Sequence, residues 1–248
     1  MKISWVISKS DVLKIKRVIA ENQDPFFRKR EERNVYKQNI VINKDTIIKT
    51  LLMCLLTSQQ RSGPNSLVSK FLRLEPFPVT SERIEQTSNT QLYLMETLKK
   101  NGLTRYINRI SLFFTNNLNK IENENWQIIK ELELLIDIDS AFKERKIADK
   151  ICSEFKGFGP KQSRNFLQSL GLTKYEIPID SRITNWLNDF GFPVTLTSSA
   201  LGDIGYYHFV SDGIQELCKQ AGIYPCLLDA AIFSSYDNKE WTDENTVF

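Results

Sequence analysis

Apolar residues recur at helical spacing along most of the chain. Residues 46–60 (TIIKTLLMCLLTSQQ) are apolar almost all round, which predicts a helix buried in a core and capped by Asp45. Residues 8–20 predict an earlier helix, capped by Ser10 or Asp11. Few stretches show the alternation typical of strands. The pattern therefore predicts an all-α protein.

The second half of the chain continues this helical pattern. Between Glu82 and Leu135 it is broken at Gly102 and at residues 123–125, and Leu112, Phe113 and Leu118 are expected in the core. Residues 137–154 predict a helix whose apolar positions are Ala141, Phe142, Ile147, Ala148 and Ile151, with Lys143, Arg145 and Lys146 on a solvated face. Further helices are expected at residues 181–190, near Ser211 to Ala221, and from Pro225 onward.

A charged stretch follows the first predicted helix. Residues 24–37 (DPFFRKREERNVYK) mix charges of both signs with Phe26, Phe27 and Tyr36. A solvated linker or helix face explains this composition more simply than a contact with DNA.

One stretch carries candidate chemistry, Phe155 to Asp180 (FKGFGPKQSRNFLQSLGLTKYEIPID). Gly157 and Gly159 allow a tight turn and Pro160 suits the first helical position, so the turn aims free backbone N–H groups at an anion. A phosphate bound there would leave the Lys161 amine beside the next nucleotide. The alternative is a helix–turn–helix corner with a solvated lysine and a capping aspartate.

This stretch resembles the helix–hairpin–helix of the DNA glycosylase superfamily, with its Gly/Pro-rich loop and trailing aspartate. FKGFGPKQS is followed by IPID, and Asp180 comes 19 residues after Lys161. The resemblance implies that Lys161 is the catalytic lysine of a base-excision-repair glycosylase, which forms a Schiff base and then cleaves the strand by β-elimination. It implies that Asp180 is the essential carboxylate and that Gly157 and Gly159 bind DNA phosphate.

Two further DNA contacts follow from the same resemblance. The buried helix ends in LLTSQQ, which is similar to the place where relatives insert an amide into the gap left by a flipped nucleotide. Gln60 is the first candidate and Gln59 the second, whereas the alternative is that both merely end a helix. Arg182 stands where relatives often carry histidine, and we expect it to contact phosphate.

The segment AGIYPCLLDAAIFSSYD resembles the C-terminal helix of 8-oxoguanine glycosylase/AP lyases, and its Asp229 points to the archaeal-type branch. Phe233, four residues later, lies on the same helix face and can stack on the base. The Asp229 carboxylate can accept from N1–H and the exocyclic amine of guanine. The alternative is an exposed Asp229 on a buried helix. Asn165 stands where relatives place a sulfur or an aromatic ring against the base.

The resemblance also implies an architecture: a six-helix barrel over residues 41–178, with a second helical domain from 1–40 and 179–248. DNA would bind in the cleft between these two lobes. Other substrates within the same fold are oxidised pyrimidines or alkylated purines, although enzymes for the latter generally lack the lysine. A non-catalytic helix–hairpin–helix DNA-binding module explains the glycines but not the pairing of Lys161 with Asp180.

Composition narrows the cofactors and partners. The 248 residues carry a net charge of only +3, so DNA would have to bind a local patch. Four scattered cysteines and one histidine favour neither zinc nor an iron–sulfur cluster, although the resemblance leaves room for a structural monovalent cation at the hairpin. Without a signal peptide or an apolar run of membrane-spanning length, we expect an intracellular protein of the cytoplasm or nucleoid. The expected partner of this monomer is double-stranded DNA that contains a damaged base.

Overall fold

The computed structural model describes residues 4–58, 60–236 and 241–246, and within them every regular element is helical. The elements are α1 (Lys9–Glu21), α2 (Pro25–Arg30), the π-helix η1 (Glu31–Val35), α3 (Lys44–Leu56), α4 (Leu67–Leu72), α5 (Ser81–Glu85), α6 (Thr90–Lys100), α7 (Ile107–Asn123), α8 (Gln127–Glu133), α9 (Ala141–Glu154), α10 (Pro160–Ser169), α11 (Ser181–Phe190), the 3₁₀ turn η2 (Ala200–Gly202), α12 (Ile204–Ala221) and α13 (Pro225–Ser235). The prediction of an all-α fold is confirmed. None of these helices combines the length and the apolar character needed to cross a membrane.

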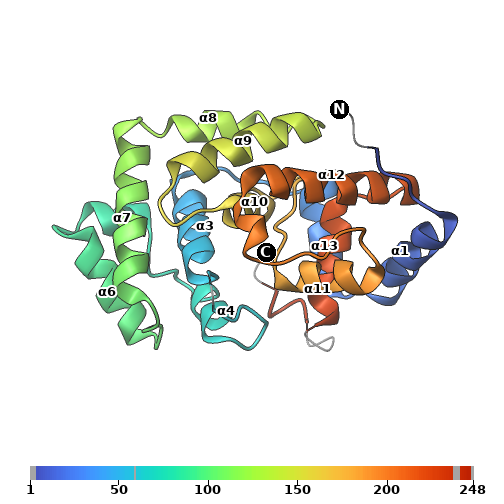
Figure 1. Ribbon diagram of the computed structural model, residues 1–248. Helices are drawn as coiled ribbons and strands as arrows, with labels where there is room; N and C mark the ends of the chain where they lie inside the picture. The colour runs from blue at the N-terminus through green and yellow to red at the C-terminus, as the bar shows by residue number, and fades with distance from the viewer. Residues whose placement is uncertain (1–3, 59, 237–240, 247–248) are drawn as a thin grey trace.

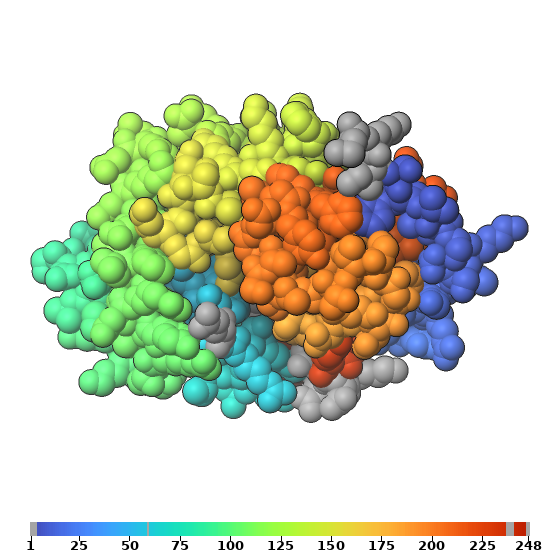
Figure 2. Space-filling view, viewed as in Figure 1, coloured from blue at the N-terminus to red at the C-terminus, as the bar shows by residue number. Residues whose placement is uncertain are grey.

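Two hydrophobic clusters divide the described residues. The first contains buried residues of α3 to α10 and lies on the left of Figure 1. The second joins α1 and α2 to α11, α12 and α13, on the right. The beginning of the chain therefore packs against its end, as the blue and orange surfaces of Figure 2 also show. The chain passes from one cluster to the other near residues 40 and 175. The division into two domains at 40/41 and 178/179 stays a prediction.

The first helix lies where it was predicted, but its cap is two residues before the first predicted one. Ser8 is its N-cap and accepts from the backbone N of Asp11 at 3.2 Å, while the Asp11 carboxylate accepts from the backbone N of Ser8 at 2.9 Å. The prediction that Ser10 or Asp11 is the cap was wrong, because Asp11 serves as the third residue of a capping box.

The cap of α3 was also predicted wrongly. Asn43 caps this helix by accepting from the backbone N of Thr46 at 2.9 Å. Asp45 instead accepts from the backbone N of Ser81 at 2.7 Å and so ties α3 to α5. The helix itself is buried as expected, with Leu51, Leu52 and Leu56 fully inside the first cluster.

The predicted Gly/Pro-rich turn forms between α9 and α10, and we call these two helices and their turn the hairpin. Gly157 takes a left-handed φ of +80°, and Asn117 of α7 fixes the turn by bonding the backbone N of Lys156 at 2.7 Å and its carbonyl O at 3.0 Å. Pro160 is the first residue of α10, and Gly171 at φ +79° follows its end. The chain thus builds a tight turn with free N–H groups at the start of α10.

Three smaller expectations differ from the structure. Phe142 is 75% exposed and Leu112 is 43% exposed, so neither belongs to a core. Helix α12 begins at Ile204 rather than near Ser211, because Asp203 caps it by accepting from the backbone N of Tyr206.

The prediction of a solvated linker or helix face at residues 24–37 was wrong for the linker but not for the helix face, because the stretch forms α2 and η1 and exposes Arg28, Glu32 and Tyr36. Phe26, Phe27, Arg30 and Asn34 are buried within it. Its polar side chains bind the C-terminal end of α10: Asn34 Nδ2 donates to Gln168 O at 3.0 Å, with further bonds from Arg33 to Ser169 O and from Lys37 to Gly171 O. Donors and positive charges suit the free carbonyls at a helix C-terminus, so the stretch anchors the hairpin helix.

Candidate active site

A cleft of ≈ 710 Å³ opens at the start of α10. Residues of the hairpin, of the loop after α3 and of the start of α11 line it. The predicted site residues among them are Gln60, Gly157, Gly159, Lys161, Asp180 and Arg182. Gln59 lies outside the described residues. The fold therefore brings to one cavity all the predicted catalytic and DNA-binding residues that the structure describes.

A smaller cavity of ≈ 40 Å³, which we call the inner pocket, shares Lys161, Asp180 and Arg182 with the cleft. All three predicted base-binding residues line it: Asn165, Asp229 and Phe233. The pocket also contains residues that sequence reasoning missed, namely Phe26, Arg30, Met53 and Gln168. Its volume holds only a few waters, far less than a nucleobase needs.

Lys161 stands in the first turn of α10, where both cavities meet. No hydrogen bond or ion pair joins its ammonium to another of the described residues. Burial lowers the pKa of Lys161 and the Arg182 guanidinium lowers it further, whereas Asp180 opposes the shift. A lysine with a lowered pKa is neutral more of the time near pH 7, and the neutral amine is the nucleophile.

Asp180 caps α11, as predicted, and its carboxylate is fully bonded. Its Oδ1 accepts from the backbone N of Arg182 at 2.8 Å and of Ile183 at 3.2 Å. Its Oδ2 accepts from Arg182 Nε at 2.9 Å and Nη2 at 2.6 Å. Burial acts to raise the pKa of Asp180, but the Arg182 charge and these bonds outweigh it, so the net shift is downward. The group is therefore held as a carboxylate beside Lys161.

The Arg182 side chain also covers Phe233, with its guanidinium carbon 3.7 Å from the ring centroid. Phe26 stacks on the Phe233 ring as well, at 4.8 Å between centroids and 17° between planes. Arg182 was expected to contact phosphate; here it is engaged by Asp180 and Phe233, and the phosphate contact stays a prediction.

Asp229 lines the inner pocket and is buried, which rules out the alternative of an exposed aspartate. It accepts from Gln168 Nε2 at 2.6 Å. Burial raises the pKa of Asp229 to about 6, against the opposing charge of Arg30. Two buried polar atoms around it lack partners among the described residues: Arg30 Nη1 and Gln168 Oε1.

Asn165 faces Thr57 and Gln162 through long contacts of 3.5 Å and 3.4 Å. The apolar residue of the inner pocket on α3 is Met53. At the cleft, the amide nitrogen of Gln60 is buried without a partner among the described residues. A Cβ on Gly159 would meet nothing within 4 Å, so this backbone is open on the side of the cleft.

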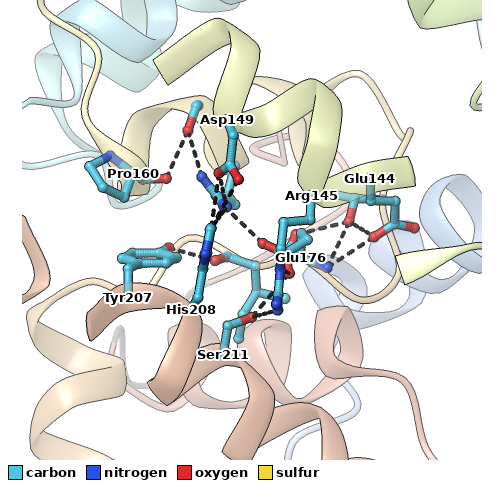
Figure 3. Close-up of polar contacts among 12 residues, drawn as sticks. Glu144, Arg145, Asp149, Pro160, Glu176, Tyr207, His208 and Ser211 are labelled. Carbon is cyan, nitrogen blue, oxygen red and sulfur yellow. Dashed lines mark hydrogen bonds and ion pairs between the residues drawn. The ribbon is translucent and has the colours of Figure 1, made fainter. Parts of the chain in front are cut away.

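A buried ionic cluster supports the hairpin helix from behind. Arg164 of α10, fully buried, donates to Glu176 Oε2 at 2.9 Å and to Asp149 Oδ1 at 2.6 Å. His208 Nε2 lies 3.0 Å from Asp149 Oδ2, and Arg145 Nε donates to Glu176 Oε1 at 2.8 Å, so Arg145 does not belong to a solvated face. Figure 3 shows three of these side chains converging: Asp149 from α9, Glu176 from the loop that precedes α11, and His208 from α12.

The cluster reaches Asp180 through one aromatic residue. The Arg164 guanidinium lies 5.0 Å from the ring centroid of Tyr207. The Tyr207 hydroxyl donates to Ile177 O and accepts from Ile179 N, both at 2.7 Å. The extended segment that ends at Asp180 is thereby fixed relative to α10, which carries Lys161.

Sequence signals existed for two of the missed residues. Gln168 follows Lys161 by seven residues, so it lies on the same face of α10. Arg30 belongs to a short helix with an Asp24 cap and Pro25 at its first position, which is a recognisable helix start.

No protein-family model and no curated protein matches the chain. Solved structures do. The crystal structure of Methanocaldococcus jannaschii 8-oxoguanine DNA glycosylase matches with a TM-score of 0.61 and 16% identity, over 93% of this chain and 96% of that one. The 8-oxoguanine glycosylase/lyase of the same organism, in complex with a 15mer DNA containing 8-oxoguanine, matches with a TM-score of 0.60 and 15% identity, over 94% and 98%. The chain shares the fold of these proteins over nearly its whole length.

Proposed function

We propose that this protein is a DNA glycosylase and AP lyase of base-excision repair that removes 8-oxoguanine from double-stranded DNA. The observation that carries the proposal is the unpaired, partly desolvated Lys161 amine next to the Asp180 carboxylate, where the cleft at the hairpin meets the inner pocket. Its fold is shared with glycosylases of that activity.

A base inside a duplex is out of reach, so the nucleotide must first leave the stack, which costs a few kcal/mol. In the proposed complex the backbone N–H groups at the start of α10 bind DNA phosphate. The free amide of Gln60 enters the gap in the duplex, where an amide offers both a donor and an acceptor to the opposite base.

The neutral Lys161 amine then attacks the sugar C1′ and breaks its bond to the base, which leaves with a proton. The nitrogen gives up the proton that the base takes away, and its lone pair then breaks the C1′–O4′ bond, with O4′ taking up a proton, to give the protonated Schiff base. Abstraction of a 2′ proton then expels the 3′ phosphate. Asp180, held ionised by its bonds, stabilises the cationic sugar in the transition state. The same reaction needs no metal or iron–sulfur cluster, and we propose that the protein acts without one, as an intracellular monomer.

The substrate is proposed from the inner pocket. The Asp229 carboxylate accepts from N1–H and the exocyclic amine of guanine, and Phe233 supplies the stacking face once Arg182 withdraws. Adenine has a lone pair at N1 and no amine at C2, so Asp229 would repel it. The carboxylate disfavours an alkylated adenine for the same reason.

The test measures base release and strand nicking separately, on duplexes that contain 8-oxoguanine, thymine glycol, uracil or 3-methyladenine. We expect release of 8-oxoguanine well above the others, and borohydride should trap a covalent protein–DNA adduct. Lys161→Gln should abolish trapping, whereas Lys156→Gln, which removes an exposed lysine of the same hairpin, should not. Trapping that persists in Lys161→Gln would place the nucleophile elsewhere, and preferred release of a pyrimidine would reject the substrate. DNA binding without release of any base would favour the non-catalytic module.

A further inference from the structure

The side-chain amide of Gln168 is held in one orientation at the wall of the inner pocket. The residue is 2% exposed, and its Nε2 donates to Asp229 Oδ2 at 2.6 Å. An ionised carboxylate only accepts hydrogen bonds, so the amide nitrogen must face it and the amide cannot turn over. The amide oxygen, Oε1, is buried without a partner among the described residues. A buried acceptor left unpaired is destabilising, and a donor on a bound ligand would satisfy it.

Asp229 and Gln168 both line the inner pocket, and the bond between Nε2 and Oδ2 joins their polar atoms into a row of four, Oδ1, Oδ2, Nε2 and Oε1. The two carboxylate oxygens accept. The amide nitrogen still has its second hydrogen to donate, because no described residue takes it, and the amide oxygen accepts. The row therefore reads acceptor, acceptor, donor, acceptor.

The edge of 8-oxoguanine has the complementary order. Its exocyclic amine and N1–H donate, O6 accepts, and N7 carries a hydrogen and donates. Guanine is identical except that its N7 is an acceptor. Along the edge that faces this row, the oxidised and the normal base therefore differ only at the fourth position.

We propose that Gln168 is the residue that distinguishes 8-oxoguanine from guanine, its Nε2 donating to O6 and its Oε1 accepting from N7–H. This inference rests on the proposed glycosylase function and names the group that senses the oxidation. With guanine in the pocket, Oε1 faces the N7 lone pair, and the bond to Asp229 prevents the amide from turning over to donate instead. Asn34 Nδ2 bonds the carbonyl O of Gln168 at 3.0 Å, which fixes the backbone behind the amide.

The test compares affinities in the Lys161→Gln protein, so that no base is released during the measurement. The probes are duplexes with guanine, 8-oxoguanine or 8-methoxyguanine at one position; the last has an oxygen on C8 but keeps N7 as an acceptor. We expect 8-oxoguanine to bind roughly 10- to 100-fold more tightly than either of the others. Adding Gln168→Met should reduce this ratio to about 3-fold or less, mainly by weakening the 8-oxoguanine complex.

Gln162→Met is the matched control. It removes another buried amide from α10, one whose Nε2 donates to the carbonyl O of Cys54 and which is not among the residues of the inner pocket. The ratio should survive this change. A ratio that survives in a folded Gln168→Met protein overturns the inference. Should Gln168→Met not fold, equal affinity of the parent protein for 8-oxoguanine and 8-methoxyguanine overturns it, and the expected preference supports it.

Base release by the native chain distinguishes a failure of this inference from a failure of the proposed function. If it releases 8-oxoguanine but Gln168→Met leaves the selectivity unchanged, only the role of Gln168 is rejected. If it releases no 8-oxoguanine from any duplex, the proposed function fails and the role of Gln168 fails with it.

Discussion

The guanidinium carbon of Arg182 lies 3.7 Å from the centroid of the Phe233 ring, on the ring that the proposed base would stack against. The same guanidinium makes two bonds to Asp180 Oδ2. One side chain therefore covers the ring and holds the carboxylate, and it lines the inner pocket of ≈ 40 Å³. Entry of a base requires Arg182 to leave Phe233.

The first prediction concerns this contact. A double-mutant cycle of Arg182→Ala and Phe233→Ala, measured by urea unfolding, should give a favourable coupling of about 0.5–2 kcal/mol, as for a partly desolvated cation over a ring. A second cycle for comparison uses Lys49 and Phe77, which lie outside both cavities. The Lys49 Nζ is 4.9 Å from the centroid of the Phe77 ring. Additive effects at Arg182 and Phe233 would mean that the guanidinium does not hold this position in solution.

Substitution of the two hairpin glycines by alanine should have different effects on the stability of the protein. At Gly157 the φ is +80° and a Cβ would come within 2.5 Å of the Phe113 ring, so Gly157→Ala should destabilise the protein by more than about 1 kcal/mol. At Gly159 a Cβ meets nothing, so Gly159→Ala should leave the melting temperature nearly unchanged. If DNA phosphate approaches this backbone, Gly159→Ala should nevertheless weaken DNA binding. Unchanged affinity in Gly159→Ala would move the phosphate site elsewhere.

The sequence predicted the parts of this structure that depend on local chemistry. Helical periodicity, the Gly157 turn and the capping role of Asp180 are set by a few neighbouring residues, and all three were found as expected. The convergence of Lys161 and Asp229 on one pocket, 68 residues apart in the chain, came only from the resemblance.

Long-range polar contacts were beyond such reasoning. Residues 24–37 look solvated because their charges have no partners nearby in the chain; their partners are the carbonyls at the end of α10, more than 130 residues away. Arg164 would be assigned to a surface on its charge alone, and only the packing of α9, α12 and the loop before α11 shows it paired and fully buried.

Arg164 carries the next prediction. Arg164→Met leaves Glu176, which has no exposed surface, with Arg145 as its remaining ionic partner, and should destabilise the fold by about 3–5 kcal/mol. Glu131→Gln breaks the partly exposed pair with Lys150 and should cost less than about 1 kcal/mol. Urea unfolding of both variants measures the difference. Equal small losses would show that the buried cluster does not hold α10 in place.

The last prediction follows from the buried carboxylate of Asp229. Burial raises the pKa of this group from 3.8 to about 6, a shift that corresponds to roughly 3 kcal/mol between its two protonation states. Because the folded pKa is the higher one, the folded protein binds the proton more tightly. Ionisation of Asp229 therefore lowers stability as pH rises from about 4 to about 6, and the full loss is present above pH 6.

Asp229→Asn removes that titration while keeping an acceptor for Gln168. The substitution should therefore stabilise the protein more at pH 7.5 than at pH 4, and the two changes in the free energy of unfolding should differ by up to roughly 3 kcal/mol. Asp11→Asn is the control: hydrogen bonds from Ser8 lower the pKa of Asp11, so its contribution is lost only as pH falls below about 4, and the effect of Asp11→Asn should be nearly the same at pH 4 and pH 7.5. Urea unfolding at both pH values measures the two variants. The stabilised Asp229→Asn protein should also lose selectivity for 8-oxoguanine, because an amide can donate as well as accept. If Asp229→Asn stabilises the protein but lowers its selectivity, Asp229 is a base-binding residue whose charge destabilises the fold. If Asp229→Asn instead destabilises the protein at pH 7.5, Asp229 is a structural residue.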